Sequence, residues 1–284
     1  MTGKLYLVAT PIGNLEDITF RAVRVLKEAD LIACEDTRHT RGLLDHYGID
    51  RPTISYHEHN ESGRTPDLIE RLKGGQSVAV VSDAGTPLIS DPGYRLVNQA
   101  LAEGISVIPI PGPSAILAAL TASGLPTDAF HFGGFLPPKK SQRLKALEAV
   151  RAYECSLVFY ETPHRILEAL EDVAAVMGER PIVLTRELTK MHEEFLRGTA
   201  AEVLENLQAR PSVKGEMTLV IGKPVAPDAS DVPIPDAVNA LIQSGIPRMD
   251  AMKTVARERG LSKREVYSAL EGGPPGPRPT PSSA

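Results

Sequence analysis

The chain has 284 residues, enough for one large or two ordinary domains, and its 42% hydrophobic and 24% charged residues are typical of a soluble globular protein. A net charge of −5 argues against a protein coated by nucleic acid but permits a local basic surface. Cys34 and Cys155 are too far apart for a metal-binding motif and argue against a disulfide scaffold, so we expect buried thiols in a reducing cytoplasm. The first residues lead directly into a predicted strand, so we expect neither a secretory signal nor a membrane span.

The N-terminal part alternates short apolar runs with helical patterns. Residues 5–9 form a continuous apolar run, which predicts a buried parallel strand, and a helix is predicted over residues 20–29. A second strand, residues 30–34, leads into Glu35-Asp36-Thr37-Arg38, and a third, residues 54–56, leads into His57-Glu58-His59-Asn60-Glu61. Several polar strand ends on one edge of a sheet predict a ligand site.

The most informative stretch is residues 78–93, in which four apolar residues precede Ser82-Asp83-Ala84-Gly85-Thr86 and then Asp91-Pro92-Gly93. We expect Asp91 to cap the helix that follows, with Pro92 in its first turn. A strand over residues 105–110 completes a βαβ unit with parallel strands. Ligands of such sheets bind beyond the carboxyl ends of the strands, although a tight turn with helix caps would also explain this loop.

A second set of strands follows a boundary near residues 112–127. Pro111-Gly112 precedes a predicted helix from Pro113 to Ala122, whose first N–H groups could bind an anion or simply start the helix. Further strands are predicted at residues 130–135, 156–160, 181–185, 194–198 and 215–222. The sequence therefore predicts two α/β domains, residues 1–115 and 116–223.

The C-terminal part has a different composition. Residues 224–236 are rich in Pro and small polar residues and predict a linker, residues 237–271 carry helical patterns, and the Pro- and Ser-rich residues 272–284 predict a disordered tail. Between Arg248 and Arg264 there are six basic and two acidic residues, a difference of +4. The helix, glycine-containing turn and helix resemble a helix-turn-helix element, but a packing or dimerisation module has the same pattern.

Several chemistries are excluded by missing motifs. The chain has neither a Gly-x-x-x-x-Gly-Lys-Ser/Thr phosphate loop nor a Gly-x-Gly-x-x-Gly after its first strand. His57 and His59 lack an evident third ligand, so no metal site is predicted. From the residues alone the prediction is a two-domain α/β protein with a polar inter-domain cleft that binds a small polar ligand.

Seven short motifs occur in an order that resembles the tetrapyrrole-methylase superfamily. They are Pro11 to Asn14, Glu35 to Arg38, His57 to Glu61, Ser82 to Gly93, Pro111 to Ala115, Gly134 to Pro137 and Tyr160 to Arg165. Within this superfamily they are similar to the bacterial enzymes that methylate a ribose 2′-oxygen of small-subunit ribosomal RNA. The resemblance implies an α/β, tetrapyrrole-methylase-like fold with an S-adenosylmethionine cleft between two domains, an appended C-terminal helical module and a homodimer. It also implies a cytidine of the small subunit as the target.

The resemblance also implies roles for individual residues. The cofactor would be bound by Pro11, Ile12, Asp83, Gly85, Thr86, Ser114, Ala115, Tyr160, Glu187, Met217 and Thr218. RNA is expected to bind to basic residues, because an acidic protein can bind RNA when such residues lie on one side. The candidates are Lys139, Lys140, Arg143, Arg257, Lys263 and Arg264.

A ribose hydroxyl is a poor nucleophile, so a general base or a polarising cation is expected to assist its attack. Candidates at strand ends are Glu35, Asp36, Arg38, His57, Glu61 and Glu161. The cluster of Glu35, Asp36 and Arg38 is the first choice for facing the substrate, and an ion-paired structural corner is its alternative. If Asp36 takes part, Asp36→Ala should bind S-adenosylmethionine and lose methyl transfer.

Two other functions remain open from the sequence. The protein could methylate a small tetrapyrrole, or it could be a non-catalytic RNA-binding assembly factor that retains the cofactor fold. The basic C-terminal helices and the Glu35-to-Arg38 motif argue against the first, and the intact cleft motifs argue against the second.

Overall fold

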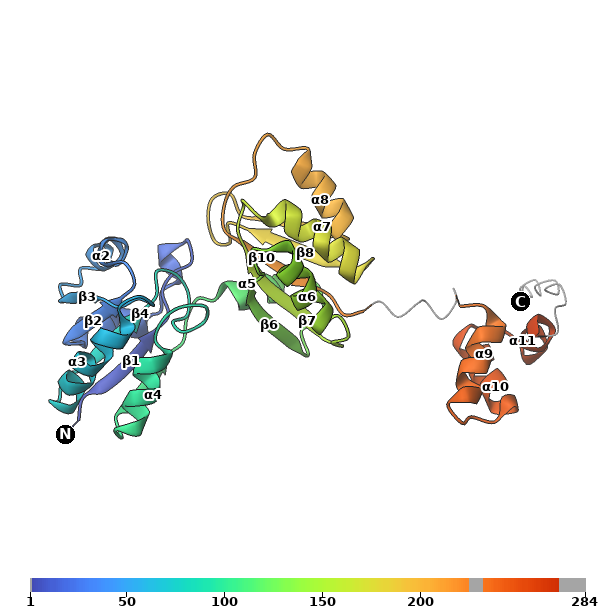
Figure 1. Ribbon diagram of the computed structural model, residues 1–284, viewed down its shortest axis with the longest axis horizontal. Coiled ribbons are helices and arrows are strands. Elements are labelled where there is room, and N and C mark those ends of the chain that lie inside the picture. The colour runs from blue at the N-terminus through green and yellow to red at the C-terminus, as the bar shows by residue number, and fades with distance from the viewer. Residues whose placement is uncertain (1, 225–231, 271–284) are drawn as a thin grey trace, which may run out of the picture. The chain divides into compact units, whose positions relative to one another are not determined.

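The computed structural model describes residues 2–224 and 232–270 (Figure 1). The chain divides into two compact units, Met1–Pro224 and Val225–Ala284. The first unit contains two five-stranded sheets. The α/β fold predicted from the sequence is confirmed, while the division of the first unit at residue 115 stays a prediction.

The first sheet is wholly parallel, with the strand order β3-β2-β4-β1-β5. Its strands are β1 (Lys4–Val8), β2 (Leu31–Cys34), β3 (Thr53–Ser55), β4 (Val78–Val81) and β5 (Ser106–Ile110). Because every strand runs in the same direction, all of their carboxyl ends lie on one edge. The loops that follow β1, β2 and β4 therefore share that edge.

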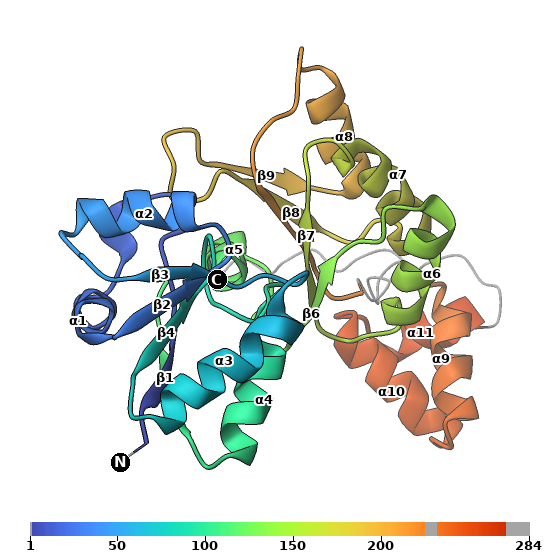
Figure 2. The ribbon, with the colours of Figure 1, turned by 60° about the vertical axis from the view of Figure 1, so that its left-hand side comes forward.

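Helices cover both faces of this sheet (Figure 2). They are α1 (Phe20–Glu28), α2 (Thr37–His46), α3 (Glu61–Lys73) and α4 (Tyr94–Ala102). Successive strand residues face opposite sides, so Val78 and Val80 pack with α3 and α4. Ala79 and Val81 pack with α1 and α2. Continuous apolar strands are expected where both faces are covered.

The second sheet is mixed, with the order β6-β7-β10-β8-β9. Its strands are β6 (Phe130–Phe135), β7 (Ser156–Glu161), β8 (Ile182–Arg186), β9 (Glu194–Gly198) and β10 (Met217–Ile221). Strand β10 is antiparallel to both β7 and β8, and Met217 pairs with Glu161 on one side and Arg186 on the other. The start of β10 therefore lies beside the ends of β7 and β8.

The two faces of the second sheet are covered by different helices. On one face Leu157, Leu184 and Leu219 pack with α6 (Lys140–Val150), α7 (Ile166–Met177) and α8 (Ala200–Gln208). On the other, Val158 and Val220 pack with α5 (Ala115–Ser123), and Ile12 from the loop after β1 joins the same cluster. Ile12, which follows the first strand of the first sheet, therefore contributes to the core beneath the second sheet.

Two predicted helix starts are wrong. Helix α4 begins at Tyr94 after Gly93, whose φ is 132°, and it has no side-chain cap, so Asp91 does not cap it. Helix α5 begins at Ala115 rather than Pro113, because the side chain of Ser114 accepts a hydrogen bond from the N–H of Leu117.

The second unit contains three described helices, α9 (Ile234–Gln243), α10 (Arg248–Glu258) and α11 (Lys263–Leu270). They enclose a small core that includes Val238, Met252 and Val266. Helix α9 begins inside the predicted linker, because Pro235 fits the first turn of a helix, where no N–H is needed. The rest of that linker is only partly described, and the predicted tail, residues 272–284, lies outside the described residues.

Both cysteines are free, as predicted; Cys34 is buried and Cys155 is partly buried. None of the described helices combines the length and the apolar character needed to cross a membrane.

Candidate active site

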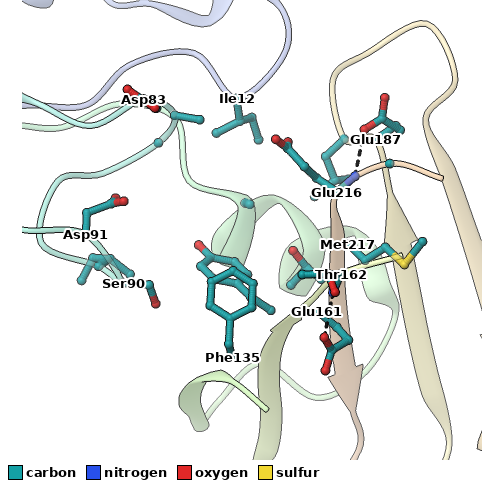
Figure 3. Close-up of a pocket in the computed structure, with 18 of the residues that line it drawn as sticks. Ile12, Asp83, Ser90, Asp91, Phe135, Glu161, Thr162, Glu187, Glu216 and Met217 are labelled. Carbon is teal, nitrogen blue, oxygen red and sulfur yellow. Dashed lines mark hydrogen bonds between the residues drawn. The ribbon is translucent and has the colours of Figure 1, made fainter. Parts of the chain in front are cut away.

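A cavity of about 580 Å³ lies within the first unit, between the strand ends of its two sheets (Figure 3). The loops after β1 and β4 and the start of α5 (Ala115–Ser123) line part of it, and β6, β7, β10 and the loop after β8 contribute the rest. Its volume is within the range of small-molecule sites. In Figure 3, Asp83, Ser90 and Asp91 lie across the cavity from Glu161, Glu216 and Met217.

Backbone hydrogen bonds fix the part of the cavity wall that the loops of the first sheet contribute. Thr10 and Gly85 form an antiparallel bridge, with N···O distances of 2.9 and 3.0 Å. Gly85 has a φ of 81°, and an added Cβ there would lie 3.4 Å from Cγ2 of Ile12. A glycine lets this loop adopt the left-handed conformation without strain and keeps the space beside Ile12 open.

Glu161 places a carboxylate on the cavity wall at the end of β7. It is 2% exposed, and its Oε1 lies 2.7 Å from Nη2 of Arg165 and accepts the N–H of Thr162 at 2.8 Å. Its Oε2 is buried without a hydrogen-bond partner among the described residues. A buried carboxylate oxygen of this kind on a cavity wall is suited to accept a hydrogen bond from a ligand.

Lys190 joins two carboxylates on the same side of the cavity. Its Nζ lies 2.9 Å from Oε1 of Glu187 and 2.9 Å from Oε2 of Glu216. The Lys190 ammonium and then the N–H of Glu216 hold the pKa of Glu187 below its usual range. Glu187 therefore stays ionised, as a fixed hydrogen-bond acceptor.

Tyr160, from β7, supplies an aromatic surface on the cavity wall. Its ring lies 5.0 Å from that of Phe132 and 5.4 Å from that of Phe135. Burial and then the nearby Asp91 carboxylate raise the pKa of Tyr160 to about 12. The phenol is therefore neutral at physiological pH.

The opposite side of the site contains carboxylates near one another at the ends of β2 and β4. Oδ1 of Asp83 accepts the N–H of Asp36 at 3.1 Å. Burial and then the Asp83 carboxylate raise the pKa of Glu35. Burial and then the Glu35 carboxylate raise the pKa of Asp91 to about 7. No set of three or more His, Cys, Asp or Glu side chains in the described parts of the chain is arranged to hold a metal ion.

Most of the residues predicted to bind the cofactor line this cavity. They are Ile12, Asp83, Gly85, Thr86, Ala115, Tyr160, Glu187, Met217 and Thr218. Pro11 and Ser114 do not line it, and the side chain of Ser114 caps α5 instead. Other lining residues were not predicted as ligands: Ser90, Asp91, Phe135, Lys190 and Glu216. The polar loop of residues 82–93 contains Ser90 and Asp91, and the Gly134-to-Pro137 motif contains Phe135, so the sequence already indicated these three. No local pattern indicated Lys190 or Glu216.

Glu35, Asp36 and Arg38, predicted to face the substrate, lie beside the cavity and do not line it. The side chain of Asp36 caps α2 by accepting the N–H of Arg38 at 2.8 Å. The side chain of Arg38 is 91% exposed.

The predicted RNA-binding residues differ in exposure. Lys139, Lys140, Arg257, Lys263 and Arg264 are exposed. Arg143 is 0% exposed and lies 2.7 Å from Asp172 in a buried ion pair, so the prediction that Arg143 contacts RNA is wrong. The helical period of α6 turns this residue toward α7, while the charge pattern of the sequence suggested a solvent-facing side chain.

Known proteins similar to this chain include several full-length relatives. A protein of Halalkalibacterium halodurans named "Ribosomal RNA small subunit methyltransferase I" is 50% identical over 273 residues, which cover 94% of each chain. A protein of Mesorhizobium japonicum with the same name is 51% identical over 267 residues, covering 94% of this chain and 90% of that protein.

The solved structures similar to this chain share its fold at low sequence identity. A uroporphyrin-III-C-methyltransferase from Thermus thermophilus has a TM-score of 0.56 and 22% identity and covers 86% of this chain and 99% of that chain. A structure of that enzyme complexed with S-adenyl homocysteine has a TM-score of 0.53 and 21% identity, covering 78% and 97%. A diphthine synthase has a TM-score of 0.61 and 18% identity, covering 78% and 90%.

The sequence model described as "Tetrapyrrole (Corrin/Porphyrin) Methylases" matches residues 4–204, which include all of the first sheet and every strand of the second except β10. Taken with the full-length relatives and with the cavity between the two sheets, this match means that the chain belongs to the tetrapyrrole methylase family.

Proposed function

We propose that this protein transfers a methyl group from S-adenosylmethionine to small-subunit ribosomal RNA, and that the acceptor is the ribose 2′-oxygen of a cytidine. The observation that carries the proposal is similarity along nearly the whole chain, because relatives 44–51% identical that bear the rRNA methyltransferase name cover 93–95% of it. This coverage includes the C-terminal helices as well as the cavity. The cytidine 2′-oxygen is supported by the sequence motifs from Pro11 to Arg165.

The cavity suits S-adenosylmethionine in size and chemistry. Its apolar walls, which include Ile12, Leu188 and Met217, can enclose an adenine ring. The carboxylates on its two sides can bind ribose hydroxyls and the positive charges of the methionine part. The buried and unpartnered Oε2 of Glu161 is one such acceptor. When bound, this cofactor supplies a methyl group already activated on a sulfonium.

The cofactor residues follow from this fit. We assign its binding to the lining residues predicted from the sequence, with the Asp83-to-Thr86 loop toward the methionine part and Tyr160, Glu187 and Met217 toward the adenosine. Pro11 and Ser114 do not line the cavity. We assign them the role of positioning their neighbours Ile12 and Ala115, which do line it.

The residues proposed to contact RNA lie at the end of β2 in the first unit and among the exposed basic residues of each unit. Glu35, Asp36 and Arg38 lie beside the cavity. The guanidinium of Arg38 is 3.5 Å from Oδ2 of Asp36 and, being 91% exposed, can also contact a phosphate. Lys139, Lys140, Arg257, Lys263 and Arg264 provide further phosphate contacts. A homodimer, which the sequence resemblance implies, and a location in the cytoplasm, which the two free cysteines favour, are part of the same proposal.

The test is transfer of labelled methyl from S-adenosylmethionine to small ribosomal subunits from cells that lack this enzyme, with a tetrapyrrole mixture in a parallel reaction. The expected result is label in the RNA at one site that resists alkaline cleavage, because a 2′-O-methyl group removes the nucleophile of that cleavage. Label only in the tetrapyrrole would overturn the substrate, and label in neither would favour the non-catalytic assembly factor.

A further inference from the structure

Two large hydrophobic side chains of the cavity wall are open to solvent. Phe135, at the end of β6, is 50% exposed, and Ile89, in the loop after β4, is 41% exposed. The apolar residues proposed to enclose the adenine of the cofactor, Ile12, Leu188 and Met217, are buried. A cofactor held against these buried side chains leaves Phe135 and Ile89 for a second ligand that enters from the open side of the cavity.

A bulge in β6 brings the Phe135 ring to Tyr160. Phe132 pairs with Val158 of β7 and Phe135 pairs with Tyr160, so β6 has one residue more than its partner between these two pairs. Residues three apart in a regular strand point to opposite faces, yet the rings of Phe132 and Phe135 lie 5.0 and 5.4 Å from the ring of Tyr160. Bulges redirect side chains beside functional sites, and Figure 3 shows the Phe135 side chain inside the cavity.

The residues around Phe135 fix the backbone that carries it. Gly134 has a φ of 68°, and an added Cβ at Gly133 would overlap the ring of Phe159, so both positions of the bulge require glycine. The next residue, Leu136, is buried in the core of the second sheet. Phe135 is therefore an exposed ring on a well-anchored segment.

Two lysines follow Phe135 on the same segment. Lys139 and Lys140 are exposed at the start of α6. The chain between the ring and the lysines is held by Arg143, whose Nη1 donates to the carbonyl of Pro138 at 3.3 Å. An aromatic ring followed by ammonium groups on an anchored segment suits a nucleotide, which offers a base for stacking and phosphates for the positive charges.

We propose that Phe135 binds the base of the acceptor nucleotide by stacking, while Ile89 covers the same base from the loop after β4, and that this contact places the ribose 2′-oxygen at the methyl group. This inference rests on the proposed function. Transfer requires the oxygen to lie in line with the bond from the methyl carbon to sulfur, so the nucleotide must be held firmly. A base that leaves its neighbours in the RNA regains stacking on the aromatic ring. Stacking accepts every base, so Phe135 orients the nucleotide and does not select cytidine.

The experiment compares wild type with Phe135→Ala and Phe135→Leu in single-turnover methyl transfer to small ribosomal subunits from cells that lack this enzyme. Leucine keeps the apolar character but cannot stack, so at subunit concentrations below saturation both variants should lose about 5- to 150-fold in rate, while Phe135→Tyr should stay within about threefold of wild type. Affinity for S-adenosylhomocysteine, measured by calorimetry, should remain within about twofold of wild type because the cofactor contacts other walls. Phe130→Ala is the matched control, since Phe130 is 43% exposed on the same strand and does not line the cavity, and it should transfer at the wild-type rate.

A second readout does not depend on activity. The chain has no tryptophan, so Phe135→Trp introduces a single indole, which can be supplied as 7-azatryptophan. This analogue absorbs at longer wavelengths than the tryptophans of ribosomal proteins, so its emission reports on this position alone. Stacking on a base should quench the emission when unmethylated subunits are added with S-adenosylhomocysteine, and S-adenosylhomocysteine alone should not. The same analogue in Phe130→Trp should show no quenching.

The outcomes separate the two proposals. Transfer by Phe135→Ala or Phe135→Leu at the wild-type rate, or an equal loss in Phe130→Ala, would overturn the role of Phe135 and leave the proposed function standing. A loss of S-adenosylhomocysteine affinity as large as the loss of rate would also overturn it, because the ring would then contact the cofactor. A wild-type protein that labels no RNA would overturn the proposed function instead.

Discussion

Arg143 carries a positive charge into the packed layer between α6 and α7. Its Nε lies 2.7 Å from Oδ2 of Asp172, which is also buried, and its Nη2 lies 3.3 Å from Glu168. Nη1 donates to the carbonyl of Pro138 at 3.3 Å. With these acceptors the guanidinium is well satisfied, so the residue that looked like an RNA contact in the sequence is a structural one.

Loss of this pair should destabilise the first unit. Arg143→Met leaves the Asp172 carboxylate buried with only Lys140 nearby, at 3.7 Å, and removal of one partner of a buried pair typically costs about 3–5 kcal/mol. We expect a lower urea midpoint for the variant. Replacing both partners, in Arg143→Met with Asp172→Leu, should recover much of the loss because no buried charge remains.

The control is Lys145→Met on the same helix, an exposed position where we expect a change within about 0.5 kcal/mol. A loss below about 1 kcal/mol in Arg143→Met would mean that Lys140 alone neutralises Asp172.

At the scale of elements, Glu194 joins β9 to β8 and to the segment after α8. Its carboxylate lies 3.0 Å from Nε of Arg186 and accepts two hydrogen bonds from Arg210, at 2.7 and 2.8 Å. The Arg210 guanidinium, opposed by burial and helped by Arg186, lowers the pKa of Glu194 to about 2. The edge strand β9 is thus held by a charge network as well as by its pairing with β8.

This network predicts a specific dependence of stability on pH. The folded chain binds the Glu194 proton more weakly than the unfolded chain, so its contribution is fully present above a pH of about 4.5 and is lost as the pH falls toward 2. In urea unfolding, Glu194→Gln should be less stable than wild type at pH 7, and the difference should narrow steadily below pH 4.5. Glu28→Gln, in an exposed pair with Arg24, should show little difference at any pH. A difference between wild type and Glu194→Gln that persists unchanged down to pH 3 would contradict this account.

At the scale of the whole molecule, we propose that the first unit transfers the methyl group and that the second unit adds RNA contacts to those of the first. The cavity lies entirely within the first unit, while Arg257, Lys263 and Arg264 are exposed on the helices of the second. A chain with a net charge of −5 can bind RNA if such basic residues contact phosphates together.

In the full chain, replacement of Arg257, Lys263 and Arg264 by Gln should weaken RNA binding and reduce its dependence on salt. Each lost phosphate contact should lower the slope of log affinity against log salt by about 0.7–0.9. S-adenosylhomocysteine affinity should not change. Replacement of Arg21, Arg24 and Lys27 of α1 by Gln removes the same charge and is the matched control. Equal effects of the two triple variants on RNA binding would show that net charge alone matters and that the second unit has no specific part.

The sequence by itself determined the local elements and the edge where the site is built. Apolar runs such as Val78 to Val81 specify buried strands, and the polar residues that follow them must lie beyond a strand end, because both properties depend on near neighbours. The family motifs located Ile12, Asp83 and Tyr160, which do line the cavity.

Only the tertiary structure decided which charges are paired and which are free. Arg143 and Asp172 are 29 positions apart, and no local pattern distinguishes their burial from a solvated helix face. The antiparallel insertion of β10 brings Glu216 to Lys190, and the left-handed residues around Asp91 turn an expected helix cap into a cavity-lining carboxylate near Glu35. Burial and long-range electrostatics arise from segments distant in sequence, so the raised pKa of Asp91 could be recognised only in the folded chain.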